Sequence, residues 1–327
     1  PDHALMAEWA DVTQRARGIL QARLLADSLG PFDGDLSDAA QLLGDRFGPT
    51  HVWSASRLEA YGACGFQFFV GSGLGLQPRD PVRVGLDAAQ LGTLVHSILE
   101  NVYQAADPDD VEALVAALPA VAGPIFADAP RQLGFRPTSL WTRLQAEVLE
   151  WIAETLREIA ALSIGYRPIA FEQRFSTLVL DTPRGPVRIR GVIDRVDRNA
   201  AGELRVIDYK TGGSHLDPKA LERGIRLQLP LYAAAARSLN LGTPVDGLYW
   251  SVRSAKPGRL TLADFSYTDE RGRTHAGPAA AIELAATHIG RTVTGVRAGI
   301  FPARAPDGGC PDYCPAAAFC WHFQPSR

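Results

Sequence analysis

The chain has 327 residues, of which 46% are hydrophobic and 21% are charged, a composition that can bury a core and excludes a largely disordered protein. Its net charge is −3, so any binding of nucleic acid must come from a local basic surface rather than from the whole protein. The longest apolar run, from Ala113 to Ala127, is interrupted by Pro119, Gly123 and Pro124 and is short for a bilayer, so we expect no membrane segment.

The sequence begins at Pro1 without a signal-peptide pattern, which predicts a cytoplasmic protein and a fragment of a longer chain. Its basic residues are biased towards arginine, because only Lys210, Lys219 and Lys256 are lysines among 33 basic side chains. Lysine is a compact point charge, whereas arginine is a planar fork that cannot deprotonate. A lysine retained against this bias indicates a position whose chemistry arginine cannot supply, and Lys210 is the candidate.

The first part of the chain is predicted to be helical. Residues 1–50 read as helical pieces that form an N-terminal arm or linker. A helix is expected over residues 54–69, because Ser54 or Ser56 can cap its start and Glu59 lies at the capping-box spacing from Ser56.

An amphipathic helix is predicted over residues 91–104, because apolar residues recur along it at helical spacing. Helical patterns follow at 109–118 and 140–162. We interpret residues 105–165 as a helical insertion rather than a separable domain, because the strands needed for a core come later in the chain.

The hydrophobic period changes after residue 168 from that of helices to that of strands. Three β-type runs joined by turn residues predict an antiparallel meander over 169–180, 186–196 and 203–210. The remaining predicted elements are a helix at 218–239, a strand at 247–253, a strand-like run at 259–266 and a last helix at 277–298. This order predicts an α/β fold with a mixed β-sheet flanked by helices.

The third run of the meander ends in the sequence RVIDYKTG. Because side chains alternate along a strand, Val206, Asp208 and Lys210 should share one face while Ile207 and Tyr209 point to the other. A carboxylate and an ammonium on an otherwise apolar strand are costly to bury without partners. The alternative is an ordinary surface ion pair between Asp208 and Lys210 or an arginine, which for an isolated D-x-K would be the better explanation.

The preceding run, GVIDR, carries a second carboxylate, Asp194. If the two runs are hairpin neighbours, Asp194 and Asp208 converge at one end of the sheet. Convergent carboxylates repel each other unless a cation or a proton lies between them. A hard divalent ion with oxygen ligands, Mg²⁺ or Mn²⁺, suits this description.

Two helices offer further polar side chains. The sequence QLPLY places Gln228 and Tyr232 four residues apart on one helix face. The sequence GTLVH places His96 beside an apolar stripe, where a lone histidine is more often a boundary residue than a metal ligand. Neither signal is specific alone, so the interpretation depends on the ordered set of motifs.

The ordered set GTLVH, GVIDR, DYKTG and QLPLY strongly resembles the RecB-type branch of the PD-(D/E)XK nuclease superfamily, and is most similar to the C-terminal nuclease domain of AddB-type helicase–nuclease subunits. The resemblance extends from about residue 32 to the C-terminus and implies a restriction-endonuclease-like core. It implies ligands of Mg²⁺ or Mn²⁺ at His96, Asp194, Asp208 and the carbonyl of Tyr209. It also implies that Lys210 is the catalytic lysine and that Gln228 and Tyr232 support the site or contact DNA.

The chemistry of these residues agrees with phosphodiester hydrolysis. A bound divalent ion polarises a phosphate oxygen and lowers the pKa of an attacking water. Lys210 can orient that water or offset the charge that develops in the transition state. Arginine would move that charge and fix a different geometry.

Four cysteines form a second candidate site: Cys64, Cys310, Cys314 and Cys320. Three of them cluster in an irregular tail, which favours a metal or cluster site. The alternatives are a structural zinc ion or two disulfides in an exported protein. The resemblance implies a 4Fe–4S cluster held by one upstream and three downstream cysteines, although the spacing C-x3-C and Gly65 differ from the family's usual C-x2-C and proline.

We expect such a cluster to have a structural role, closing the tail at 300–327 onto Cys64 within a nuclease domain that spans 51–327. Closing so long a loop removes unfolded-state entropy worth roughly 4–5 kcal/mol on the analogy of a disulfide.

Positive charge gathers around the proposed site, because the segment 184–226 contains ten basic and six acidic residues. A phosphate-tracking channel needs such a surface, although a solvated, salt-bridged face explains any single arginine as well. The sequence contains no P-loop motif, so a helicase motor is expected in the missing part of the chain or in a partner protein.

These features predict a metal-dependent DNA nuclease, acting as a single-strand exonuclease in a helicase–nuclease of double-strand-break repair. A stand-alone iron–sulfur exonuclease like those associated with CRISPR systems is one alternative. A noncatalytic DNA-binding scaffold on the same fold is another.

Overall fold

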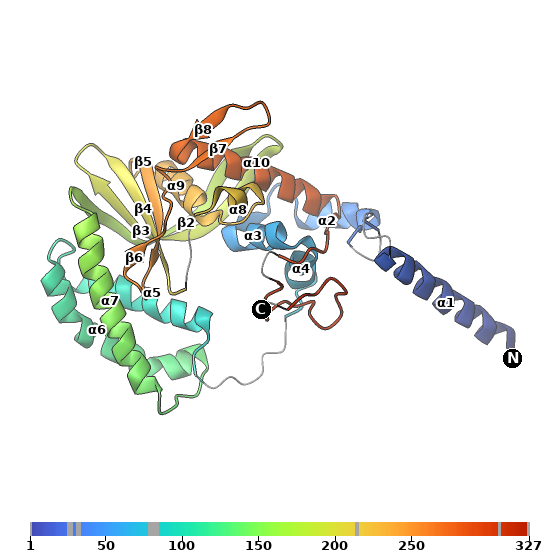
Figure 1. Ribbon diagram of the computed structural model, residues 1–327, viewed down its shortest axis with the longest axis horizontal. Helices are drawn as coiled ribbons and strands as arrows, with labels where there is room; N and C mark the ends of the chain where they lie inside the picture. The colour runs from blue at the N-terminus through green and yellow to red at the C-terminus, as the bar shows by residue number, and fades with distance from the viewer. Residues whose placement is uncertain are drawn as a thin grey trace.

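The structure is a computed structural model that describes residues 2–24, 29–30, 34–77, 85–212, 216–306 and 309–325. A twisted sheet lies between two groups of helices, and the N-terminal helix α1 (Asp2–Leu24) extends away from the rest of the molecule (Figure 1). The C-terminal tail lies beside the short helices that follow α2 (Figure 1).

Among the described residues, the main sheet is mixed and has six strands, β1 (Val52–Ser54), β2 (Tyr166–Thr182), β3 (Gly185–Asn199), β4 (Glu203–Lys210), β5 (Thr243–Ser251) and β6 (Lys256–Pro257). Strand β3 pairs with β2 and β4 in antiparallel orientation and with β1 in parallel orientation. Strand β4 then pairs with β5 in parallel. The predicted meander and the mixed sheet flanked by helices are therefore confirmed.

The helices are α2 (Ala40–Arg46), α3 (Ala55–Ala63), α4 (Gly65–Phe68), α5 (Ala88–Ala105), α6 (Val111–Leu133), α7 (Trp141–Leu162), α8 (Pro218–Glu222), α9 (Gln228–Ser238) and α10 (Gly277–Arg297). A 3₁₀ turn (Ser37–Ala39) precedes α2, and a π-helical turn (Phe69–Gly73) follows α4. The strand-like run predicted at 259–266 is wrong, because residues 259–265 are irregular. A small separate hairpin, β7 (Ser266–Thr268) and β8 (Thr274–Ala276), begins where that run ends.

Two helices that we predicted as continuous are divided. The one expected over 54–69 stops at Cys64, whose extended backbone ends α3 and whose sulfur caps α4. The one expected over 218–239 is split into α8 and α9, because Gly224 and Arg226 between them adopt left-handed backbone angles. The capping box predicted from Ser56 and Glu59 is also wrong, since Ser54 caps α3 by accepting the N–H of Arg57.

Helix α6 is longer than predicted and runs through Pro119, Pro124 and Pro130 without a break. By length and hydropathy alone it is able to cross a membrane, so our argument from an interrupted apolar run was wrong. A single helix of this kind is weak evidence for a membrane segment. One stripe of it, which includes Leu118 and Phe126, is buried in a core shared with α5 and α7.

The two faces of the sheet bury two separate cores. One core joins a sheet face to α3, α9 and α10, and Val206 of β4 belongs to it. The other joins the opposite face to α5, α6 and α7, and it contains Ile207 and Tyr209. This division confirms the alternation predicted along β4. Leu43 and Phe47 lie in the first core, so α2 packs with the domain that follows it.

A buried ion pair supports the middle of β3. The guanidinium of Arg195 donates from Nε to Oδ1 of Asp197 at 2.6 Å and also contacts the hydroxyl of Tyr103. The hydroxyl of Ser163 donates to the same aspartate at 3.3 Å. Because a buried charge without a partner is strongly destabilising, this network fixes the strand immediately beyond Asp194.

Candidate active site

The predicted carboxylates meet where strands β3 and β4 stop pairing. Arg195 is opposite Ile207 in the ladder, and continuing this register places Asp194 opposite Asp208. The Oδ2 atom of Asp194 accepts the N–H of Tyr209 at 2.8 Å, so a side chain replaces the missing ladder bond. Both carboxylates are buried, and the hairpin brings them together as the sequence predicted.

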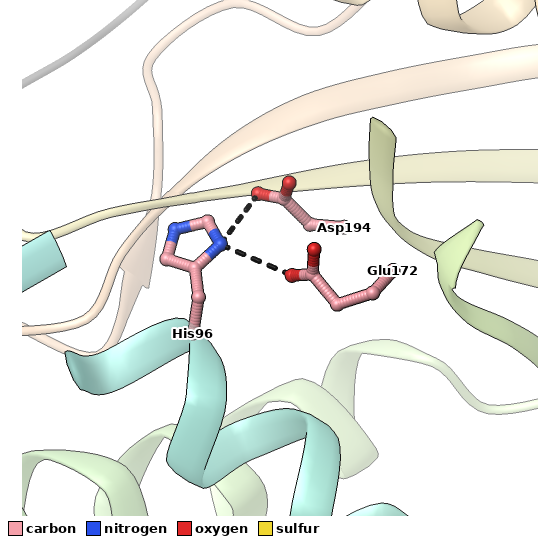
Figure 2. A group of neighbouring side chains, drawn as sticks. All are labelled: His96, Glu172 and Asp194. Atoms are coloured by element: carbon pink, nitrogen blue, oxygen red, sulfur yellow. Dashed lines mark hydrogen bonds and ion pairs between the residues drawn. The ribbon is translucent and has the colours of Figure 1, made fainter. Parts of the chain in front are cut away.

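His96 reaches the same point from helix α5. Its Nδ1 atom lies 3.2 Å from Oε1 of Glu172 and 3.6 Å from Oδ2 of Asp194 (Figure 2). Its Nε2 atom lies 3.1 Å from the carbonyl oxygen of Tyr209. The predicted histidine and backbone carbonyl are therefore next to each other, with the imidazole between the helix and the sheet.

Glu172 is a member of this group that sequence reasoning missed. His96, Glu172 and Asp194 each offer a ligand atom, and these atoms lie within 4.8 Å of one another. In the register of β2 and β3, Phe171 is opposite Arg195 and Gln173 is opposite Ile193, which puts Glu172 beside Asp194. Three carboxylates thus stand side by side on three neighbouring strands.

A shift of register in β2 kept Glu172 from being predicted from the sequence. Counting back from the turn between β2 and β3 does not bring Glu172 opposite Asp194, because the register shifts between Phe175 and Leu178. Glu172 itself has a φ of 44°, a left-handed angle that is unusual for a residue other than glycine. A lone carboxylate in the run IAFEQRF was the only available indication.

Lys210 lies on the other side of Asp208. Its Nζ atom forms an ion pair with Oδ2 of Asp208 and donates to Oε1 of Gln228 at 2.9 Å. The ammonium is also 5.5 Å from the centre of the Tyr249 ring. Helix α9 therefore presents Gln228 to the lysine, as the motif order predicted.

Tyr232 lies one turn further along α9 and is buried. Burial raises the pKa of its hydroxyl, and the charges of Asp208 and Asp194 raise it further. The tyrosine therefore stays protonated. Of the predicted side chains, His96 and Asp194 share a compact group with Glu172, whereas Asp208 lies outside that group and is paired with Lys210.

The electrostatics of the group favour the protonated forms of its buried aspartates and of His96. Burial raises the pKa of Asp194 to about 8, and the neighbouring charge of Asp208 acts in the same direction. Burial likewise raises the pKa of Asp208, although the ammonium of Lys210 opposes this. Burial lowers the pKa of His96, but the hydrogen bond to Glu172 and the surrounding carboxylates outweigh it and bring the pKa to about 9. Protons and a bound cation would relieve the same repulsion between the two aspartates.

The four cysteines line one small pocket, together with Phe66 and Phe323. They are free thiols, not disulfides. Backbone N–H groups of Gln67 and Gln324 donate to the sulfurs of Cys64 and Cys310, each at 3.4 Å. Within the described part of the chain, the sulfurs do not form a group as compact as that of His96, Glu172 and Asp194; they are spread around the pocket.

Comparison with known proteins shows where this arrangement occurs. Residues 52–321 match the PD-(D/E)XK nuclease superfamily. The chain is 30% identical over 227 residues to an ATP-dependent helicase/deoxyribonuclease subunit of Moorella thermoacetica, covering 62% of this chain and 19% of that protein. It is 30% identical over 261 residues to the corresponding protein of Streptococcus equi subsp. zooepidemicus, an alignment that covers 76% of this chain and 23% of that protein. It is also 29% identical over 246 residues to the protein of the same name from Leuconostoc citreum, an alignment that covers 69% of this chain and 21% of that protein. The chain spans about a fifth of the length of these relatives.

The raised pKa values predict how stability depends on pH and metal. Asp194 and His96 bind protons more tightly in the folded protein, with pKa values of about 8 and 9, than in an unfolded chain, where the values are about 3.9 and 6.5. Their contribution to the free energy of unfolding is therefore complete below those unfolded values and is lost as the pH rises through 8 and 9.

We expect the Tm of EDTA-treated protein to fall between about pH 6 and pH 9, and Mn²⁺ to raise it by several degrees at the higher pH and little at the lower, because protons compete with the metal. Differential scanning fluorimetry measures both. Asp194→Asn should lose the metal-dependent increase. An increase of the same size at both pH values, or one that survives in Asp194→Asn, would contradict this account of the site.

Proposed function

The chain belongs to the PD-(D/E)XK nuclease superfamily, and we propose that it hydrolyses phosphodiester bonds of DNA as the nuclease domain of a helicase–nuclease. The observation that carries the proposal is the row of Glu172, Asp194 and Asp208 on neighbouring strands, with His96 on one side and Lys210 on the other. An intact set of acids and a lysine supports catalysis over a noncatalytic scaffold.

The donors suit a hard divalent cation. A nitrogen from His96, carboxylate oxygens from Asp194 and Asp208 and the carbonyl of Tyr209 are ligand types that Mg²⁺ and Mn²⁺ accept, and Glu172 joins them by its distance to His96. The raised pKa values of the two aspartates support this assignment, because a cation would relieve their repulsion. When bound, the ion would polarise a phosphate oxygen and lower the pKa of the attacking water.

Lys210 supplies a fixed positive charge beside these carboxylates. Asp208 and Gln228 hold its ammonium from two sides, so little reorganisation is needed when negative charge develops on the phosphate. A guanidinium has a longer, planar donor set and would not place its charge between these two partners. These two contacts therefore support a role that requires lysine at this position.

The substrate follows from the charge around the site and from the relatives. The segment 184–226 is net basic and includes the strands that carry both aspartates, which suits a strand of phosphates. The relatives' names combine a helicase with a deoxyribonuclease. We therefore propose single-stranded DNA fed from a helicase motor, as in an exonuclease of double-strand-break repair in the cytoplasm.

The cysteine pocket is proposed to hold a 4Fe–4S cluster with a structural role. Four thiols around a shared space, rather than around one point, suit a multi-atom cluster better than a single zinc ion. Backbone N–H groups already donate to two of the sulfurs, as in the outer shell of such centres. A single zinc ion held by the same four thiols is the alternative.

Replacing the proposed catalytic lysine tests the nuclease site. Lys210→Arg keeps the charge but not the geometry, so we expect Mn²⁺-dependent cleavage of single-stranded DNA to fall about 100-fold or more, while the protein stays folded. The matched control is Lys219→Arg on the exposed surface of α8, which should cleave like wild type. Full activity in Lys210→Arg, or equal losses in both variants, would contradict the proposed role.

Anaerobic purification tests the cysteine pocket. We expect a brown protein with iron and sulfide in equal amounts, and Cys314→Ser should lose the colour and about 4 kcal/mol of unfolding free energy on the analogy of a lost cross-link. Asp208→Asn should keep the colour, because its change lies in the other site. A colourless protein that contains zinc would refute the cluster, and an unchanged stability of Cys314→Ser would refute the structural role.

A further inference from the structure

Helix α3 carries a carboxylate that accepts a hydrogen bond from the start of a different helix, α9. Oε1 of Glu59 accepts the N–H of Leu227 at 2.6 Å, across 168 residues of sequence. Burial raises the pKa of Glu59, and the charges of Arg226, Lys210 and Asp208 also act on it. Glu59 therefore lies at the edge of the candidate active site, although none of the steps derived above uses it.

The start of α9 needs an acceptor from elsewhere. Leu227 is the residue at its N-terminal cap and has no side-chain oxygen, and the backbone before it is in a left-handed conformation at Arg226. In a capping box, the third helical residue would accept the N–H of the cap residue, but in α9 that residue is Pro230. Glu59 supplies this bond, and its negative charge also favours the positive end of the helix dipole.

The same helix start holds the proposed catalytic lysine. Gln228 is the first residue of α9, directly after Leu227, and its Oε1 accepts from Nζ of Lys210 at 2.9 Å. Two consecutive residues at the start of α9 are thus fixed by hydrogen bonds. Leu227 donates to Glu59, and Gln228 accepts from Lys210. We propose that Glu59 is a positioning residue of the nuclease site, which fixes the start of α9 and thereby the place of the Lys210 ammonium.

The backbone of α3 packs closely against the turn between α8 and α9. A Cβ on Gly62 would lie 2.5 Å from the carbonyl oxygen of Gly224 and 2.8 Å from that of Arg223, so only glycine allows this close approach. Helix α3 ends at Cys64, one of the four cysteines of the pocket. The helix is therefore held at one end by the cysteine pocket, and it fixes the start of α9 through Glu59.

Hydrogen exchange tests the contact without requiring activity. In the 327-residue chain, Glu59→Leu should speed amide exchange in a peptide covering residues 226–232 about tenfold or more, because the start of α9 loses its cap. Glu59→Gln keeps an acceptor oxygen and should stay within about threefold of wild type in exchange and in cleavage. The control is Glu222→Leu, an exposed carboxylate on α8, which should change neither. Wild-type exchange in Glu59→Leu, or equal effects of Glu59→Leu and Glu59→Gln, would overturn the proposal.

A double-mutant cycle tests whether Glu59 acts through Gln228, and it rests on the proposed nuclease function. Glu59→Leu should lower kcat about tenfold or more with little change in KM. In a Gln228→Ala background the same change should cost less than about twofold, because the link to Lys210 is already gone. Equal losses in both backgrounds would show a general structural effect and refute the positioning role. If the wild-type chain cleaves no DNA, the nuclease proposal fails, whereas the exchange experiment still decides the role of Glu59.

Discussion

The structure depends on one electrostatic constraint: three carboxylates stand in a row on neighbouring strands with too little positive charge around them. Glu172, Asp194 and Asp208 come from β2, β3 and β4, and two of the three are buried. Repulsion in such a place has to be relieved by protons, by fixed cations or by a bound metal ion. The raised pKa values of Asp194 and Asp208 follow from this repulsion and from burial.

The surrounding elements keep the row from moving apart. The Arg195–Asp197 pair is buried in β3 next to Asp194, so the strand cannot shift without exposing an unpaired charge in the core. Helix α5 brings His96 against two of the carboxylates, and α9 holds Lys210 against the third through Gln228. Rigid placement of this kind is what stabilisation of a transition state requires.

Much of this site was predictable, because it follows from local alternation. Asp208 and Lys210 share a face by the period of a strand, and a hairpin brings Asp194 opposite Asp208. Glu172 was not predictable by the same counting, because a register shift in β2 intervenes. Glu59 was misread as a cap of its own helix, because a local spacing rule cannot see a partner 168 residues away.

The errors in the fold have the same origin. The breaks at Cys64 and between α8 and α9 follow from tertiary contacts, and α6 continues through three prolines with one stripe packed in the second core. The pocket that Cys64 shares with the C-terminal tail is likewise a long-range feature. The clustered cysteines indicated a metal or cluster site, and the resemblance to a family implied that Cys64 joins it. Periodicity predicted the sheet and its two faces, whereas contacts between distant segments decided where helices end.

The most direct test of the central claim is calorimetric titration of Mn²⁺ into the protein near pH 7.5, in two buffers with different ionisation enthalpies. If the three carboxylates and His96 surround one cation, binding should release about one to two protons, because Asp194 and His96 are protonated beforehand. The heat should then differ between the buffers, and Asp194→Asn should not bind. Binding without proton release, or undiminished binding in Asp194→Asn, would contradict the account.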